Sequence, residues 1–236
     1  MTSSAEIPIC TQCSHLSKSL FCKIEAINLE AVEHEKQSIH LKKGELLFAE
    51  GATPQGLYCV SKGKLKLAKM GEDGKEQILR LINSGDIIGY RALLSADKYN
   101  ASAYALEDGD ICFISKKMFL NLLQNDTSLS LEMMKILGND LKKAEAHITH
   151  LAQKPVRERI AEALLLIQQT YGYETDQQTI NAILTREEIA NLVGTATETA
   201  IRLLSEFKQD GIIELNGKKI KIINAAKLQS TANLSD

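Results

Sequence analysis

The sequence predicts an α+β protein in which an N-terminal antiparallel β-roll is joined by one long helix to a C-terminal winged helix-turn-helix. Three observations predict this fold. Short alternating strands punctuated by glycine fill residues 38–114, a pattern typical of an antiparallel roll. Apolar residues then recur at spacings of three and four through one long helical stretch. Two short helical patterns, separated by Gly194 and followed by a hairpin pattern, come last.

Length and composition are those of an ordinary globular protein. The 236 residues can build one large domain or two small ones, 44% of them are hydrophobic, and the net charge is −2. No apolar run reaches membrane-spanning length and the N-terminus lacks an apolar signal core, so we expect a cytoplasmic protein with no membrane partner. Five cysteines in such a chain favour metal binding, redox chemistry or simple burial over a disulfide framework.

Changes in composition and residue pattern along the chain divide it into five segments. Cysteines mark the first segment, glycine-rich alternation the second and heptad spacing the third. Pro155 breaks the heptad helix and marks the boundary to the fourth segment. The expected segments are a cysteine-containing arm (1–24), the β-roll (25–125), a dimerisation helix (126–153), the winged helix-turn-helix (154–226) and a polar, frayed tail (227–236).

The third segment carries an unbroken heptad seam. Packing of this helix on its own roll is an alternative explanation of the stripe, but three regular repeats favour a parallel homodimer. At the end of the helix His147 and His150 lie i, i+3, where positive charge would suit the C-terminal helix dipole. The expected dimer interface is Met134, Leu137, Leu141, Ala144, Ile148 and Leu151.

The helix-turn-helix begins with a local signal. Thr185 and Glu188 have the spacing of a capping box, in which each side chain accepts a hydrogen bond from the other residue's backbone N–H. Gly194 then allows the turn into a second helix, which buries one apolar stripe. Its opposite face, built like that of a DNA recognition helix, presents Thr197, Glu198, Ile201, Arg202 and Ser205.

A hairpin pattern follows, with Asn216-Gly217 as a type I′ turn signal. Lys218, Lys219 and Lys221 at or near its tip would place positive charge beside a phosphate backbone. There is a plainer interpretation of the second helix. Glu198 and Arg202 lie i, i+4 and would form an exposed ion pair. Residues 184–224 hold six Lys/Arg and six Asp/Glu, so this segment has no basic excess, and DNA binding must be focused.

Four stretches of the sequence carry a family resemblance. In chain order they are LKKGELLFAEG, LYCVSKGKLKL, SGDIIGYRALL and LTREEIANLVGTATETAIRLL. Taken together, they resemble the CRP/FNR family of bacterial transcription regulators. The resemblance covers nearly the whole chain. It implies a cyclic-nucleotide-binding-like roll that senses a signal, a homodimer bound to double-stranded DNA, contact with RNA polymerase and no catalytic activity. The rival hypothesis is a ligand-binding or enzymatic β-roll with an accessory helical domain, but the roll shows no nucleophile or paired carboxylates.

The resemblance also bears on the signal. Family members that bind cyclic AMP carry Gly-Glu-Leu and then Arg-Ser or Arg-Thr in the roll, where Glu binds the ribose and Arg the cyclic phosphate. Here these positions read Gly89-Tyr90-Arg91 and Asn100-Ala101. A buried phosphate without a paired cation is costly, so we expect no cyclic AMP binding in the usual mode.

The oxygen-sensing branch of the family implies a [4Fe-4S] cluster held by cysteines. Its candidate ligands here are Cys10, Cys13, Cys22 and Cys112. The gap between Cys13 and Cys22 is longer than is typical of that branch. Two alternatives stay open: a thiol redox switch at the Cys-x-x-Cys pair, and a set in which Cys22, Cys59 and Cys112 have no ligand role.

The recognition face predicts a half-site. Arg202 can donate two hydrogen bonds to guanine O6 and N7, and Glu198 can accept one from cytosine N4. Members that prefer TGTGA carry an Arg where Thr197 stands, and members that prefer TTGAT have an apolar residue there and a Ser where Ile201 stands. Because Thr197 cannot bind guanine bidentately, the resemblance implies an inverted repeat of TTGA-like half-sites about one helical turn apart.

Overall fold

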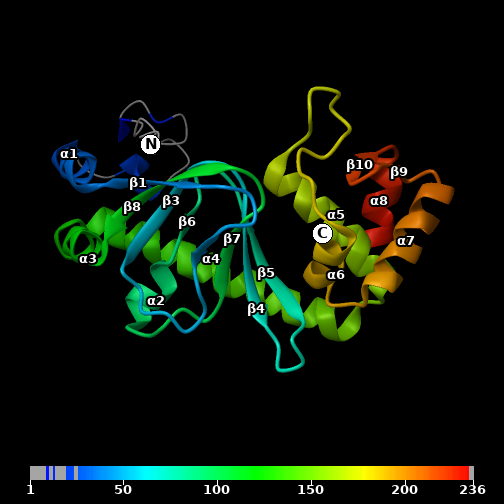
Figure 1. Cartoon of the computed structure of the whole chain (residues 1–236), viewed down its shortest axis with the longest axis horizontal. Helices are drawn as coiled ribbons and strands as arrows, with labels where there is room; N and C mark the ends of the chain where they lie inside the picture. Colours follow the sequence, from blue (N-terminus) through cyan, green and yellow to red (C-terminus); the bar gives the residue numbers. More distant parts are fainter. Residues whose placement is uncertain (1–8, 11–12, 14–19, 24–25, 234–236) are drawn as a thin grey trace. The chain divides into compact units, whose positions relative to one another are not determined.

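The computed structural model of the chain describes residues 9–10, 13, 20–23 and 26–233, with the backbone alone for 22, 23, 26 and 27. The chain divides into two compact units. Unit 1 combines residues 1–69 with 82–142, and unit 2 combines residues 70–81 with 143–236 (Figure 1). Within the described ranges, no helix has both the length and the apolar character that a membrane span requires.

The predicted antiparallel roll is present as two four-stranded sheets. Strand β8 (Gly109–Ser115) lies inside the first sheet and pairs in antiparallel register with both β1 (Gln37–Leu41) and β3 (Gly56–Lys62). The first sheet has the order β1-β8-β3-β6, from β1 (Gln37–Leu41), β8 (Gly109–Ser115), β3 (Gly56–Lys62) and β6 (Ile87–Ile88). The second has the order β2-β7-β4-β5, from β2 (Leu46–Phe48), β7 (Ser102–Ala105), β4 (Leu65–Met70) and β5 (Glu76–Ile82).

Unit 1 has two hydrophobic cores because alternate strand residues face opposite sides of a sheet. One core holds inward-facing residues of both sheets, such as Val60, Leu65 and Ile111. The other holds Leu57 and Ile114 of the first sheet together with helical residues. Those residues come from the 3-10 helix η3 (Leu20–Lys23), α1 (Ala26–Glu35), α2 (Tyr90–Ser95), α3 (Lys116–Asn125) and the first turns of α4.

The predicted long helix is α4 (Thr127–Gln153). Asp126 precedes it, and its carboxylate accepts a hydrogen bond from the backbone N–H of Leu129 at 3.0 Å, as an N-cap residue does. Leu129 and Met133 are the buried residues of the helix. Beyond Met133, most side chains of α4 are exposed.

Unit 2 contains the predicted helix-turn-helix and hairpin. Pro155 stands at the N-cap of α5, where its missing N–H costs nothing. Ile160 and Leu164 of α5 and Phe207 of α7 are all buried, and all three belong to unit 2. The elements are α5 (Val156–Tyr171), α6 (Arg186–Val193), α7 (Thr197–Gln209), β9 (Ile213–Asn216), β10 (Lys219–Ile222) and α8 (Ala225–Ala232) (Figure 1).

The predicted polar tail is wrong for residues 227–232, which belong to helix α8. Asn224 caps this helix, since its side-chain oxygen accepts from the backbone N–H of Lys227 at 2.9 Å. Leu228 and Ala232 lie four residues apart, both are fully buried, and α8 packs against α5. Two apolar residues in an otherwise polar stretch were too weak a periodic signal to predict a helix.

The hairpin is present, but its turn differs from the predicted type. Asn216 pairs with Lys219, so the two-residue loop is Gly217-Lys218. Of these two residues only Gly217 has a positive φ, of 61°. A type I′ turn requires positive φ at both loop positions, so the turn is not type I′. Lys218 still lies at the tip.

Candidate nucleic-acid interface

Local interactions fix both ends of α6. The predicted capping box is present: Thr185 Oγ1 accepts from the backbone N–H of Glu188 at 3.0 Å, and Glu188 Oε2 accepts from that of Thr185 at 2.8 Å. Gly194 closes the helix in the left-handed conformation, with φ 71° and ψ 53°. A glycine adopts this conformation without strain, so the chain can turn directly into α7.

Helix α7 has one buried and one exposed face. Thr197 is half-buried, whereas Glu198, Ile201, Arg202 and Ser205 are exposed. Spacings of three and four put these side chains on one side of the helix. The structure therefore groups the predicted base-contacting residues on one accessible surface. The opposite face buries the predicted stripe of Ala200, Leu203, Leu204 and Phe207.

Arg202 is ion-paired, but not with the residue that the sequence favoured. Its Nη1 donates to Glu206 Oε1 at 2.5 Å, one turn further along α7. The expected Glu198–Arg202 pair is wrong, and Glu198 has no ion-pair partner among the described residues. The carboxylate of Glu198 is therefore available to a partner molecule.

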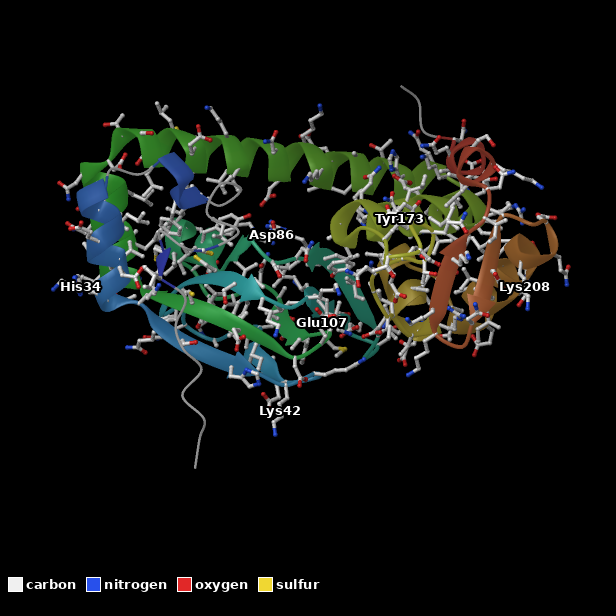
Figure 2. All side chains as sticks on the ribbon, turned by 90° about the horizontal axis from the view of Figure 1, so that it is seen from above. His34, Lys42, Asp86, Glu107, Tyr173 and Lys208 are labelled. Atoms are coloured by element: carbon white, nitrogen blue, oxygen red, sulfur yellow. The ribbon has the colours of Figure 1, made fainter. Side chains whose placement is uncertain are left out.

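Arg157 of α5 holds the carboxyl end of α7 in place. Its Nη1 donates to Glu206 Oε2 at 3.0 Å and its Nη2 to Asp210 Oδ2 at 2.6 Å. The guanidinium carbon lies 4.7 Å from the ring centroid of Phe207, a cation–π distance. Sequence reasoning missed this arginine because its partners are about fifty residues away along the chain. Nearby Lys208, in the last turn of α7, is exposed (Figure 2).

Acidic residues neutralise part of the hairpin's positive charge. Lys219 Nζ lies 2.7 Å from Glu174 Oε1, and Lys221 Nζ lies 3.6 Å from Asp176 Oδ2. Hydrogen bonds from Thr179 hold the pKa of Asp176 below its usual range, so this carboxylate stays ionised. Lys218, exposed at the tip, is the hairpin lysine for which the described residues show no such ion pair.

The loop that carries Glu174 and Asp176 is linked to the hairpin through the backbone. Tyr173 (Figure 2) pairs with Ile180 across the loop, and Thr179 pairs with Lys221 of β10. Arg186, the first residue of α6, donates through Nη2 to the carbonyl of Gly217 at 2.9 Å. The hairpin tip is therefore fixed relative to the helix-turn-helix, which sequence reasoning did not foresee.

Five of the six predicted dimer residues are exposed on α4. Met134 is 64% exposed, Leu141 61% and Ile148 66%. Ala144 and Leu151 are exposed as well, whereas Leu137 is half-buried against the core of unit 1. Large apolar side chains repeated along one helix at this exposure are typical of an interaction surface, and the dimer interface stays a prediction.

Tyr90 stands where the resemblance places a ribose-binding carboxylate. It is buried, and its hydroxyl donates to the carboxylate of Asp140 on α4. Asn100, at the phosphate-binding position, is an exposed neutral residue. These contacts give Tyr90 a packing role inside unit 1. The expected lack of cyclic AMP binding stays a prediction.

Four described cysteines gather beside α1 in unit 1. Cys59 and Cys112 lie directly opposite each other on β3 and β8. Burial raises the pKa of the Cys59 thiol, and the nearby thiols of Cys112, Cys10 and Cys13 raise it further. Sequence reasoning left Cys59 out of the ligand set, because only the strand register shows that it faces Cys112.

Charged neighbours surround the Cys10 thiol. Lys36 Nζ donates to Cys10 Sγ at 3.3 Å and lies 2.9 Å from Glu33 Oε1. Glu33 also accepts a hydrogen bond from the backbone N–H of Cys10. Burial, and then the bond to Glu33, raise the pKa of Cys10 to about 11, and burial raises that of Cys112.

The described thiols do not by themselves form a metal site. Within the described residues, no three or more His, Cys, Asp or Glu side chains are arranged to hold a metal ion. A thiol must lose its proton to become a ligand, and burial opposes that loss at Cys10, Cys59 and Cys112. The side chain of Cys22 lies outside the described part, so the iron–sulfur cluster stays a prediction.

Comparison with known proteins agrees with this architecture. Residues 38–126 match the family model of the cyclic nucleotide-binding domain, and residues 158–231 match that of the Crp-like helix-turn-helix domain. FixK2 from Bradyrhizobium japonicum has a similar fold, with a TM-score of 0.77 at 22% identity over 85% of this chain and 99% of that one.

Two relatives extend the similarity to sequence. The fumarate and nitrate reduction regulatory protein of Vibrio cholerae is 29% identical over 228 residues, 94% of this chain and 91% of that protein. The anaerobic regulatory protein of Bacillus subtilis is 30% identical over 191 residues, 80% of this chain and 79% of that protein. These proteins are regulators, which sets aside the hypothesis of an enzymatic roll. The chain belongs to the CRP/FNR family of transcription regulators and carries that family's DNA-binding helix-turn-helix.

Proposed function

We propose that the chain acts in the cytoplasm as a homodimer that binds inverted repeats of TTGA-like half-sites and regulates transcription in response to a signal received by its roll. The observation that carries this proposal is the exposed face of α7. Glu198, Ile201 and Arg202 project from it together, while the opposite face is buried. A recognition helix needs this division, since base edges can be contacted only by side chains that the fold leaves free.

The chemistry of this face supports a TTGA-like half-site. Arg202 offers two parallel donors for guanine O6 and N7, and Glu198 offers acceptors for cytosine N4. The single hydroxyl of Thr197 cannot bind a second guanine bidentately, which disfavours TGTGA. The exposed side chain of Ile201 suits apolar contact with a thymine methyl group.

The exposed stripe on α4 supports dimerisation. If a second copy of the helix packed in parallel, Met134, Leu141 and Ile148 of each protomer would be covered by the same three residues of the other protomer. A two-fold dimer presents two α7 helices and therefore reads an inverted repeat with half-site centres about 34–36 Å apart. Lys218 at the tip of the hairpin would add a phosphate contact, which strengthens binding without selecting sequence.

The thiols of unit 1 are the candidate receiver of the signal. Two chemistries fit a gathered set of cysteines. One is an iron–sulfur cluster on Cys10, Cys13, Cys22 and Cys112, and the other is reversible oxidation of the thiols. Either would alter the surroundings of α1 and β8. We infer from family membership that the DNA-bound dimer acts through RNA polymerase.

Selection of binding sites from a random DNA pool tests the DNA-binding proposal. We expect enrichment of an inverted repeat with TTGA-like half-sites, and loss of the guanine preference in the Arg202→Ala variant. Lys208→Ala serves as the matched control, because Lys208 is an exposed cation in the last turn of α7, beyond the base-contacting residues. Enrichment of TGTGA, or of no palindrome, would contradict the reading of this face.

Anaerobic purification separates the two thiol chemistries. A cluster requires a broad visible absorption band with matching iron and sulfide contents, both lost in Cys112→Ser. Cys59→Ser is the matched control, because Cys59 faces Cys112 across the sheet but does not belong to the proposed ligand set. A colourless protein that lacks iron would leave reversible thiol oxidation, which mass spectrometry of alkylated samples then detects.

A further inference from the structure

A pocket of about 160 Å³ lies within unit 2, between the last turns of α4, one side of α5 and the end of α6. An engineered protein cavity of about 150 Å³ binds benzene, so this space admits a small organic molecule. Of the predicted site residues, Leu151 alone is among those lining it. The full lining is His147, His150, Leu151, Arg159, Glu162, Ala163, Leu165, Leu166, Gln169, Leu192 and Val193.

Two nitrogen atoms on side chains that line the pocket are buried without a hydrogen-bond partner among the described residues: His147 Nε2 and Arg159 Nε. Another nitrogen of the Arg159 guanidinium, Nη1, donates to the carbonyl of Val193 at 2.7 Å. An unpaired buried donor is costly, and such groups in proteins nearly always find a partner. A bound acceptor would supply one.

The charges around the pocket favour an anion. The carboxylate of Glu162 is already engaged, with Oε1 2.6 Å from His150 Nδ1 and Oε2 3.4 Å from Lys154 Nζ. The charge of Arg159 has no carboxylate partner among the described residues. Burial lowers the pKa of His147, which disfavours the positive charge that the sequence suggested for this histidine at the helix end.

We propose that this pocket binds a small monocarboxylate whose apolar body is about as large as a six-membered ring. The carboxylate accepts charge-assisted hydrogen bonds from Arg159 Nε and from His147, in the tautomer that carries its proton on Nε2. The apolar body lies against leucines of α5 and α6. Because the ligand touches three helices at once, its binding stabilises their packed arrangement.

Calorimetric titration of the full-length protein with sodium benzoate tests the proposal, with benzamide as the neutral molecule of the same shape. We expect saturable benzoate binding with a Kd of about 1 mM or below. Benzamide should bind about tenfold more weakly or worse, because it lacks the charge that pairs with Arg159. Equal affinities, or no benzoate binding, would overturn the proposal.

Two variants locate the site. Leu166→Trp fills the pocket with a larger side chain and should abolish benzoate binding. Leu79→Trp is the matched control, because Leu79 is a leucine of unit 2 with 42% exposure, against 44% for Leu166, and does not line the pocket. Arg159→Lys keeps the charge but removes Nε, and should weaken binding about tenfold. Benzoate binding that survives Leu166→Trp unchanged would show that the site lies elsewhere.

Methyl NMR of the unaltered protein tests the proposal even if these variants fail to fold. Benzoate should shift the methyl resonances of Leu165, Leu166 and Leu192, which line the pocket, and leave those of Leu203 in α7 in place. Shifts confined to other leucines would refute the assignment. All of these measurements are made without DNA, so their outcome is independent of the proposed half-site.

Discussion

Replacing Leu141 by alanine gives a quantitative test of the α4 stripe as a dimer interface. Burying a whole leucine side chain is worth about 1.5–3 kcal/mol. Since Leu141 is 61% exposed, covering the exposed part contributes about 1–2 kcal/mol per protomer and about 2–4 kcal/mol per dimer. Because about 1.4 kcal/mol corresponds to a tenfold change, the dimer Kd should rise by about 25-fold to several hundred-fold in Leu141→Ala.

Sedimentation velocity over a range of protein concentrations measures this Kd. Leu46→Ala is the control, because Leu46 is a 46% exposed leucine that belongs to β2 and not to α4, and its loss should leave the Kd unchanged. Leu141→Asp is the stronger perturbation, since it would place two carboxylates face to face in an apolar seam at a cost of several kcal/mol. This variant should sediment as a monomer.

The reasoning also requires that the variants stay folded. Leu141 belongs to neither hydrophobic core of unit 1, so the circular dichroism of both Leu141 variants should match that of the parent protein. A dimer Kd unchanged in Leu141→Ala, together with a stable dimer in Leu141→Asp, would refute the assignment of this face. An unfolded Leu141→Ala variant would show instead that the exposed residue stabilises the monomer.

Three further predictions concern unit 2. Arg202→Ala should cost about 1–3 kcal/mol of DNA-binding free energy on the preferred site and relax the preference at its guanine. Lys218→Ala should weaken binding to all DNA sequences alike and reduce the slope of log affinity against log salt concentration by about one. Fluorescence anisotropy at several salt concentrations distinguishes the two variants, and a sequence-independent loss of affinity in Arg202→Ala would refute base readout. Thr185→Ala removes one half of the capping box and should lower the free energy of unfolding by about 1 kcal/mol in urea titrations; an unchanged midpoint would show that the cap contributes nothing. Burial lowers the pKa of His147, so the folded state binds fewer protons than the unfolded state, and stability should fall as the pH drops below about 6.5; this part of the fall should be absent in His147→Gln when urea midpoints are compared at pH 7.5 and 5.5.

The features that sequence reasoning predicted are those specified over short stretches of chain. The capping box of Thr185 and Glu188 involves residues three apart, so its chemistry is complete within one turn of helix. The bounds of α4 follow from heptad spacing and from Pro155, which cannot continue a helix. The division of α7 into buried and exposed faces follows from a single period. Each of these features came from the sequence because no distant residue decides it.

The features that sequence reasoning missed depend on contacts between segments that are far apart along the chain. Cys59 joins the thiol group only because β3 and β8 pair in a register that sets it opposite Cys112. Helix α8 forms around Leu228 and Ala232, which gain their burial from packing against α5. The pocket beside Arg159 needs three helices to enclose it. No local pattern carries this information, because burial is a property of the assembled unit.

The ion pair on the recognition helix shows how a distant residue decides between two local solutions. Glu198 and Glu206 each lie one turn from Arg202, and in an isolated helix a carboxylate on the N-terminal side is the better partner. In the folded chain Arg157 binds Glu206 at 3.0 Å, which holds that carboxylate where Arg202 can reach it. If Arg202 leaves Glu206 to bind a guanine, as we propose, Glu206 keeps Arg157 as a partner, so no unpaired carboxylate is left behind. Glu198, which has no ion-pair partner among the described residues, would remain available to a cytosine amine, so the arrangement on α7 is compatible with the proposed base contacts.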